Sequence, residues 1–145
     1  MSYDVRFEDA DGNQIYLADR HQLRGGMYAL GTVSDFAEGR YVHLGTTEAW
    51  LNITYNYADY FYRLWSEGGL RGLYGKKAQE VAAILDSILN KFDPEVPVDI
   101  DQKPCGCHQS YTCYWATTRA NVVDCLSNLH VLATLVPPDS IFKGD

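Results

Sequence analysis

The chain is 145 residues long, 46% of it is hydrophobic and 21% is charged, and its formal net charge is −7. This length and composition predict one globular domain spanning residues 1–145, folded alone or as a homo-oligomer, and they exclude a long disordered block. The charge argues against a nucleic-acid-binding protein, which needs clustered Lys and Arg. We predict a cytoplasmic protein with no membrane partner, because the chain starts with the charged segment MSYDVRFED and its apolar runs are short.

The first segment alternates apolar and polar residues. Tyr3, Val5 and Phe7 alternate with polar neighbours, the pattern breaks at DADGN, and it resumes over residues 14–17. Apolar residues at a period of two on both sides of a turn rich in Asp, Gly and Asn predict a β-hairpin. Short extended segments are predicted over residues 27–31 and 41–44, between glycines.

The segment LNITYNYADYFYRLW follows, directly after Trp50. An extended backbone over residues 49–55 places Trp50, Asn52 and Thr54 on one face, because side chains alternate along a strand. Asn56 is the predicted N-cap of a short helix that ends at the glycine pair 68–69. Tyr57, Phe61 and Trp65 share one face of that helix.

Two longer helices are predicted after it. Apolar residues recur at three-and-four spacing over residues 76–92, up to Asp93-Pro94, and again over residues 114–136, up to Pro137-Pro138. Strands first and helices after indicate an α+β domain. We expect a small antiparallel sheet, made of the N-terminal hairpin plus one or two strands, packed against a layer of three helices.

The connection between these helices is rich in cysteine. KPCGCHQSYTC contains Cys105, Cys107, His108 and Cys113, which are weak candidate ligands of a structural zinc ion. The two-residue gap typical of paired zinc thiolates is missing, so a disulfide and ordinary reduced cysteines stay open as alternatives. No third residue orients a base beside a nucleophile here, and no other residue set predicts catalysis. An enzyme is therefore not the favoured interpretation, and no cofactor is predicted beyond the zinc alternative.

The amides and aromatics of the first helical region suggest a ligand site. Asn supplies both a donor and an acceptor, and tyrosines can stack on a planar ring, so this region suits a nucleotide-like ligand. Basic residues at the start of the next helix are placed to bind a phosphate, because a helix N-terminus attracts anions. The alternative is that the aromatics are core and the amides cap backbone. The predicted ligand-binding residues are Trp50, Asn52, Thr54, Asn56, Tyr57, Arg71, Tyr74 and Lys76.

Several of these segments carry a resemblance. An Asn-Ile-Thr-Tyr/His-Asn core, a G-[IL]-R-x-[IL]-Y-G turn, a YW pair and a PD…GD end match residues 52–56, 69–75, 114–115 and 138–145. In these motifs the chain resembles a group of small uncharacterised proteins encoded by phages and prophages. It departs from them in carrying CGCHQSYTC where the group has an acidic loop.

The resemblance implies a context rather than an activity. A compact acidic phage protein in the host cytoplasm is expected to antagonise a host defence. It can do so by sequestering a nucleotide-derived small molecule, or alternatively by inhibiting a host defence protein through direct contact with a tyrosine-rich acidic surface.

Overall fold

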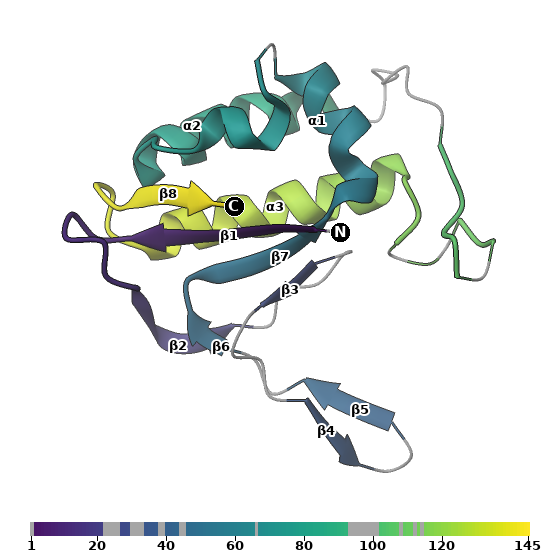
Figure 1. Ribbon diagram of the computed structural model, residues 1–145, viewed down its shortest axis with the longest axis horizontal. Helices are drawn as coiled ribbons and strands as arrows, with labels where there is room; N and C mark the ends of the chain where they lie inside the picture. The colour runs from purple at the N-terminus through teal and green to yellow at the C-terminus, as the bar shows by residue number, and fades with distance from the viewer. Residues whose placement is uncertain are drawn as a thin grey trace.

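The fold is given by a computed structural model that describes residues 2–21, 27–29, 34–37, 40–43, 46–65, 67–92, 102–107, 109–111, 113 and 115–145 (Figure 1). The predictions for Asp93-Pro94, His108 and Tyr114 lie outside these residues. The prediction of an α+β fold is confirmed: an antiparallel sheet packs against helices. No helix in the described ranges is long and apolar enough to cross a bilayer.

The main sheet has four antiparallel strands in the order β3-β7-β1-β8. These are β1 (Ser2–Glu8), β3 (Met27–Ala29), β7 (Trp50–Thr54) and β8 (Ile141–Gly144). Alternation along β1 buries Tyr3, Val5 and Phe7, as the sequence predicts. Val5 pairs with Leu51 of β7, and Phe7 pairs with Phe142 of β8. The strand β1 therefore lies between β7, from the middle of the sequence, and β8, from residues 141–144.

The N-terminal hairpin differs from the prediction in its second strand. The turn is present, since Asp9 Oδ1 accepts hydrogen bonds from the Asp11 and Asn13 amides at 2.9 Å each. However, β2 (Tyr16–His21) pairs with β6 (Thr46–Glu48), in a separate two-stranded sheet. The reason is that Ala49 stands between the two arms: its carbonyl accepts from Phe7 N at 3.0 Å and its amide donates to the Ile15 carbonyl at 3.1 Å. A third small sheet pairs β4 (Ser34–Ala37) with β5 (Arg40–His43).

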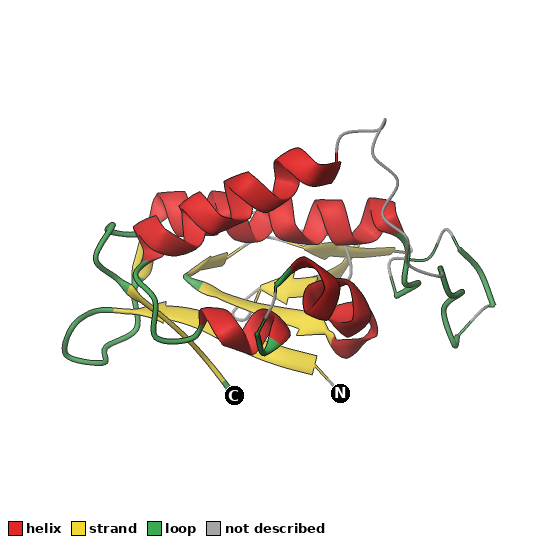
Figure 2. Ribbon diagram, turned by 90° about the horizontal axis from the view of Figure 1, so that it is seen from above, coloured by secondary structure: helices red, strands yellow, loops and turns green. Residues whose placement is uncertain are grey.

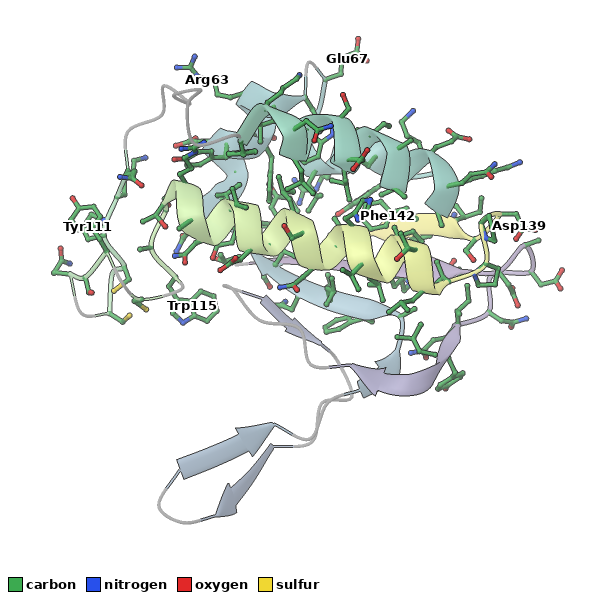
Figure 3. The ribbon with its side chains drawn as sticks, turned by 180° about the vertical axis from the view of Figure 1, so that it is seen from behind. Arg63, Glu67, Tyr111, Trp115, Asp139 and Phe142 are labelled. Carbon is green, nitrogen blue, oxygen red and sulfur yellow. The ribbon has the colours of Figure 1, made fainter. Side chains whose placement is uncertain are left out.

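The helices are α1 (Ala58–Leu64), α2 (Ala78–Leu89) and α3 (Arg119–Leu135), with 3₁₀ turns η1 (Tyr55–Tyr57), η2 (Gly69–Leu73) and η3 (Asn90–Phe92). Figure 3 shows α3 lying across the sheet, and Figure 2 shows α2 beside it on the same side. The predicted inward positions Val81, Leu85 and Ile88 of α2 are buried. The helix α3 begins five residues later than predicted, after Thr118, whose side chain accepts from Asn121 N.

The start of α2 is enclosed by the segment that precedes β8. Ala78 N donates to the Ser140 carbonyl at 2.7 Å, and Gln79 N donates to the Pro138 carbonyl at 3.1 Å. The first amides of a helix are the groups that would hold an anion. At α2 two of them already have backbone partners, so the predicted phosphate site at this helix start loses its physical basis.

Candidate functional site

The predicted ligand-binding residues do not gather around one point. Alternation along β7 is confirmed, because Leu51 and Ile53 are buried while Trp50 and Asn52 are half-buried on the other face. In Figure 1 the described helices all lie above the main sheet, so none of them covers the opposite face. Asn52 Nδ2 donates there to Ser2 Oγ at 2.6 Å and to Asp4 Oδ1 at 2.5 Å. The Asn52 amide therefore joins the two central strands of the sheet.

Thr54 and Asn56 bond to the protein's own backbone. Thr54, not Asn56, is the N-cap residue, because Thr54 Oγ1 accepts from Asn56 N at 3.2 Å. Asn56 Nδ2 donates to the Trp115 carbonyl at 2.9 Å, and Thr117 Oγ1 donates to the Asn56 carbonyl at 2.7 Å. Tyr57 is fully buried in the core. The contacts of the predicted residues therefore favour the alternative interpretation, in which the polar side chains bond within the protein and the aromatic ring belongs to the core. This holds for Asn52, Thr54, Asn56 and Tyr57.

Arg71 and Tyr74 belong to a different group, which we call the Arg71 patch and which consists of Tyr3, Tyr55, Tyr62, Arg71, Tyr74 and Asp145. The exposed Arg71 guanidinium lies over the rings of Tyr3 and Tyr55, at 5.2 and 5.4 Å from their centroids. Its Nη2 donates to Tyr55 Oη at 2.7 Å, and its Nε donates to the main-chain oxygen of Asp145 at 3.1 Å. Two cation-π contacts and two hydrogen bonds therefore fix the position of this cation.

The tyrosines of the patch differ in exposure. Tyr3 is buried, which together with nearby Tyr62 raises its pKa, whereas Tyr62 is 56% exposed. Tyr74 is half-buried, and its hydroxyl oxygen is buried without a hydrogen-bond partner among the described residues. Burial, followed by the charge of Asp145, raises the pKa of Tyr74 to about 12. The Tyr3 and Tyr74 hydroxyls, whose pKa values are raised, therefore stay neutral at neutral pH.

Gly144 allows the end of β8 to reach this patch. A Cβ atom on Gly144 would overlap the Tyr74 ring. Because glycine has no Cβ, β8 can run directly against that ring, and Asp145 then reaches β1, where its Oδ1 accepts from Asp4 N at 3.1 Å. Lys76, the remaining predicted residue, is half-buried, and its carbonyl accepts from Phe142 N at 2.9 Å.

A second candidate site is the cysteine cluster, formed by Cys105, Cys107 and Cys113. Their sulfur atoms all lie within 4.8 Å of one another, and Cys107 Sγ is 3.6 Å from Cys113 Sγ. Hydrogen bonding to Cys105, burial and hydrogen bonding to Cys113 raise the pKa of the Cys107 thiol to about 11. This cluster could hold a metal ion. Figure 3 shows Tyr111 and Trp115 on the segment that carries it, beside the helices.

The segment around the cysteine cluster is joined to the body by a few named contacts. Lys103 and Thr117 exchange backbone hydrogen bonds at 3.0 and 2.9 Å, and Lys103 Nζ forms an ion pair with Asp59 Oδ2 at 3.1 Å. Asn121 Nδ2 donates to the carbonyls of Cys113 and Ala116, at 3.0 and 2.9 Å. Cys125 is buried on α3 and is not part of the cluster.

Three segments far apart in the sequence meet in the Arg71 patch: residues 52–56 supply Tyr55, residues 69–75 supply Arg71 and Tyr74, and residues 138–145 supply Asp145. Comparison of the chain with protein-family models, curated proteins and solved structures found no match. The sequence prediction missed Tyr3, Tyr55, Tyr62 and Asp145 as neighbours of Arg71.

Proposed function

We propose that this chain is a binding protein that contacts a partner protein through the Arg71 patch. The observation that supports this most is the exposed Arg71 guanidinium held over the rings of Tyr3 and Tyr55, together with the exposed Tyr62, which interacts with Tyr3. Arg and Tyr are the residue types enriched where interfaces gain most of their binding energy. A cation that is already fixed loses little side-chain freedom when a partner binds, which favours affinity.

The contacts of the predicted pocket residues favour a protein partner over a small ligand. A small-molecule site is usually concave and needs polar groups free to face the ligand. The side chains of Asn52 and Asn56 instead donate to other groups of the chain, and Thr54 Oγ1 accepts from Asn56 N. What is left for recognition is the exposed Arg71 guanidinium and the exposed Tyr62 side chain, supported by tyrosine rings that are buried or half-buried.

The charges around the patch indicate which charged groups a complementary partner surface carries. Arg71 uses two of its five N–H donors within the described part of the chain, which leaves three for a carboxylate or phosphate group. Asp145 lies beside this cation, and the chain as a whole is acidic, with a net charge of −7. The complementary partner surface therefore carries an acidic group at its centre and basic side chains at its rim.

Sequestration of a nucleotide-derived small molecule is the second candidate, and the three remaining Arg71 donors are the observation in its favour, because guanidinium binds phosphate in two parallel hydrogen bonds. Antagonism of a host defence is the role that the phage-protein resemblance implies for either candidate.

The test uses the full chain as bait in a bacterial lysate, followed by affinity measurement with the purified partner. Tyr62→Ala and Arg71→Ala remove the patch side chains, and Tyr111→Ala is the matched control, because Tyr62 and Tyr111 are both 56% exposed. We expect wild type and the control to capture the same partner, and each patch variant to weaken binding at least about tenfold, or 1.4 kcal/mol.

A partner captured equally by all four proteins would contradict the assignment of the patch. A panel of cyclic nucleotides and ADP-ribose derivatives provides the other arm. A rise in melting temperature with one of them, lost in Arg71→Ala and kept in Tyr111→Ala, would replace the protein partner by the small ligand. Circular dichroism of each variant separates loss of binding from loss of folding.

A further inference from the structure

We propose that Cys105, Cys107 and Cys113 bind one Zn²⁺ ion through their three sulfur atoms. Zinc takes tetrahedral thiolate ligands at about 2.3 Å, which separates the sulfurs by roughly 3.8 Å. The observed Cys107–Cys113 distance of 3.6 Å is close to this value, and all three sulfurs lie within 4.8 Å of one another. The sulfurs are thus already grouped as a single ion requires.

The backbone around Cys105 supports this grouping. Cys105 N donates to the Ser110 carbonyl at 2.9 Å, and Gln109 N donates to the Cys105 carbonyl at 3.1 Å, so residues 105–110 close a tight loop. Ser110 N also approaches Cys105 Sγ at 3.5 Å, which helps to hold this side chain in place. Gln109 adopts φ 53°, a left-handed conformation that is unfavourable for a residue with a Cβ. A ligand that holds the loop closed gives a reason for that conformation.

A disulfide is the competing use of the same atoms. The Cys107 and Cys113 sulfurs are close enough to be joined after a modest movement, but a disulfide uses only two of them and leaves Cys105, which is buried beside them, unexplained. An ion uses all three. The soft thiolate set selects zinc over magnesium or calcium, which take oxygen ligands.

The role of the ion follows from where the cluster is attached. Asn121 of α3 donates to the Cys113 carbonyl, and Asn56 at the start of the α1 region donates to the Trp115 carbonyl. These two bonds attach the cysteine segment to the body of the protein. An ion bound to Cys105, Cys107 and Cys113 therefore adds a further constraint beside them. The three thiolates supply three of the four ligands of a tetrahedral ion, and the bound ion supports the attachment of the start of α3 to the α1 region.

The test is metal analysis of the full chain, purified in a reducing buffer without chelator after growth with zinc. We expect inductively coupled plasma mass spectrometry to find one zinc ion per chain. Loss of a residue that only hydrogen-bonds to a metal ligand typically lowers metal affinity by roughly 10- to 100-fold. Loss of a ligand itself should lower zinc affinity by more than this in each of Cys105→Ser, Cys107→Ser and Cys113→Ser. Cys125→Ala, which removes a buried thiol outside the cluster, should leave zinc bound. Removal of zinc with a chelator should lower the melting temperature of wild type and leave that of the serine variants unchanged.

Cobalt substitution of the wild type keeps the test independent of whether the serine variants fold. Co²⁺ bound by thiolates in a tetrahedron gives sulfur-to-metal charge-transfer absorption and intense visible bands. Absence of these bands together with absence of zinc from the reduced wild type would overturn the proposal. So would a Cys107–Cys113 disulfide in freshly isolated protein, or retention of zinc by all three serine variants.

Discussion

The Arg71 patch and the cysteine cluster are built in opposite ways. The patch draws its residues from positions between Tyr3 and Asp145, and every one of them is attached to a core strand or helix. The cysteine cluster draws its residues from positions 105–113 and depends on a tight loop with a few bonds to the body. The first site therefore inherits its rigidity from the global fold, whereas the second has to obtain it locally.

The largest expected effect breaks the patch through the core. Phe142 is fully buried between the Phe7 and Tyr74 rings, at centroid distances of 5.1 and 5.6 Å, and it belongs to the strand that leads to Asp145. Phe142→Ala should lower the free energy of unfolding by about 3–5 kcal/mol in urea denaturation, because it removes a ring and leaves a cavity.

The control for this variant is Lys143→Ala, which changes an exposed residue of the same strand and should stay within about 0.5 kcal/mol of wild type. Equal effects of the two substitutions would contradict the dependence of the patch on the core.

The next effect loosens the cysteine segment without touching the core. Asn56→Ala removes the bond from Nδ2 to the Trp115 carbonyl, so we expect a loss of about 1 kcal/mol in the free energy of unfolding. Hydrogen exchange should accelerate at residues 115–118 and stay unchanged in β1. Asn90→Ala, at an exposed position after α2, is the matched control. Faster exchange spread over the whole sheet would show that the two regions are not independent.

The smallest effect raises stability within the patch. Tyr74→Phe removes a buried hydroxyl that has no hydrogen-bond partner, and it should raise the free energy of unfolding by about 1 kcal/mol at pH 7. Tyr62→Phe, which removes an exposed hydroxyl, should stay within about 0.5 kcal/mol of wild type. Destabilisation by Tyr74→Phe would mean that the hydroxyl has a partner after all.

The same variant tests a dependence on pH. The pKa of Tyr74 rises from 10.0 to about 12 on folding. Between these values the unfolded chain loses the proton and the folded chain keeps it, so the unfolded state binds fewer protons and stability falls as pH rises. Wild type should lose stability over this window relative to Tyr74→Phe, as measured by urea denaturation at several pH values.

Local patterns in the sequence were sufficient for the parts of the fold that depend on neighbours. The three-and-four spacing placed α2 and its buried face, and alternation placed Leu51 and Ile53 inside. The short spacing of Cys105, Cys107 and Cys113 likewise made them candidates for one ion. These predictions needed no knowledge of which strands pair.

The remaining features depend on partners far apart in the sequence. The strand β8 has four residues and no clear alternation, and its position follows from pairing with β1. The Arg71 patch exists only once Asp4 meets Asp145 and Tyr55 meets Arg71. The Asn56 prediction failed because Thr54 and Asn56, two residues apart, are both suitable caps, and only the backbone geometry at Thr54 distinguishes them.

The bonds at the start of α2 also constrain the order in which the chain folds during synthesis. The amides of Ala78 and Gln79 receive their acceptors from residues 138–140, and β1 receives its second neighbour from residues 141–144. On the ribosome the acceptors at residues 138–140 emerge about sixty residues after the amides of Ala78 and Gln79. Until then one edge of β1 stays open to other strands, so the nascent chain depends on its late segment to protect its earliest one.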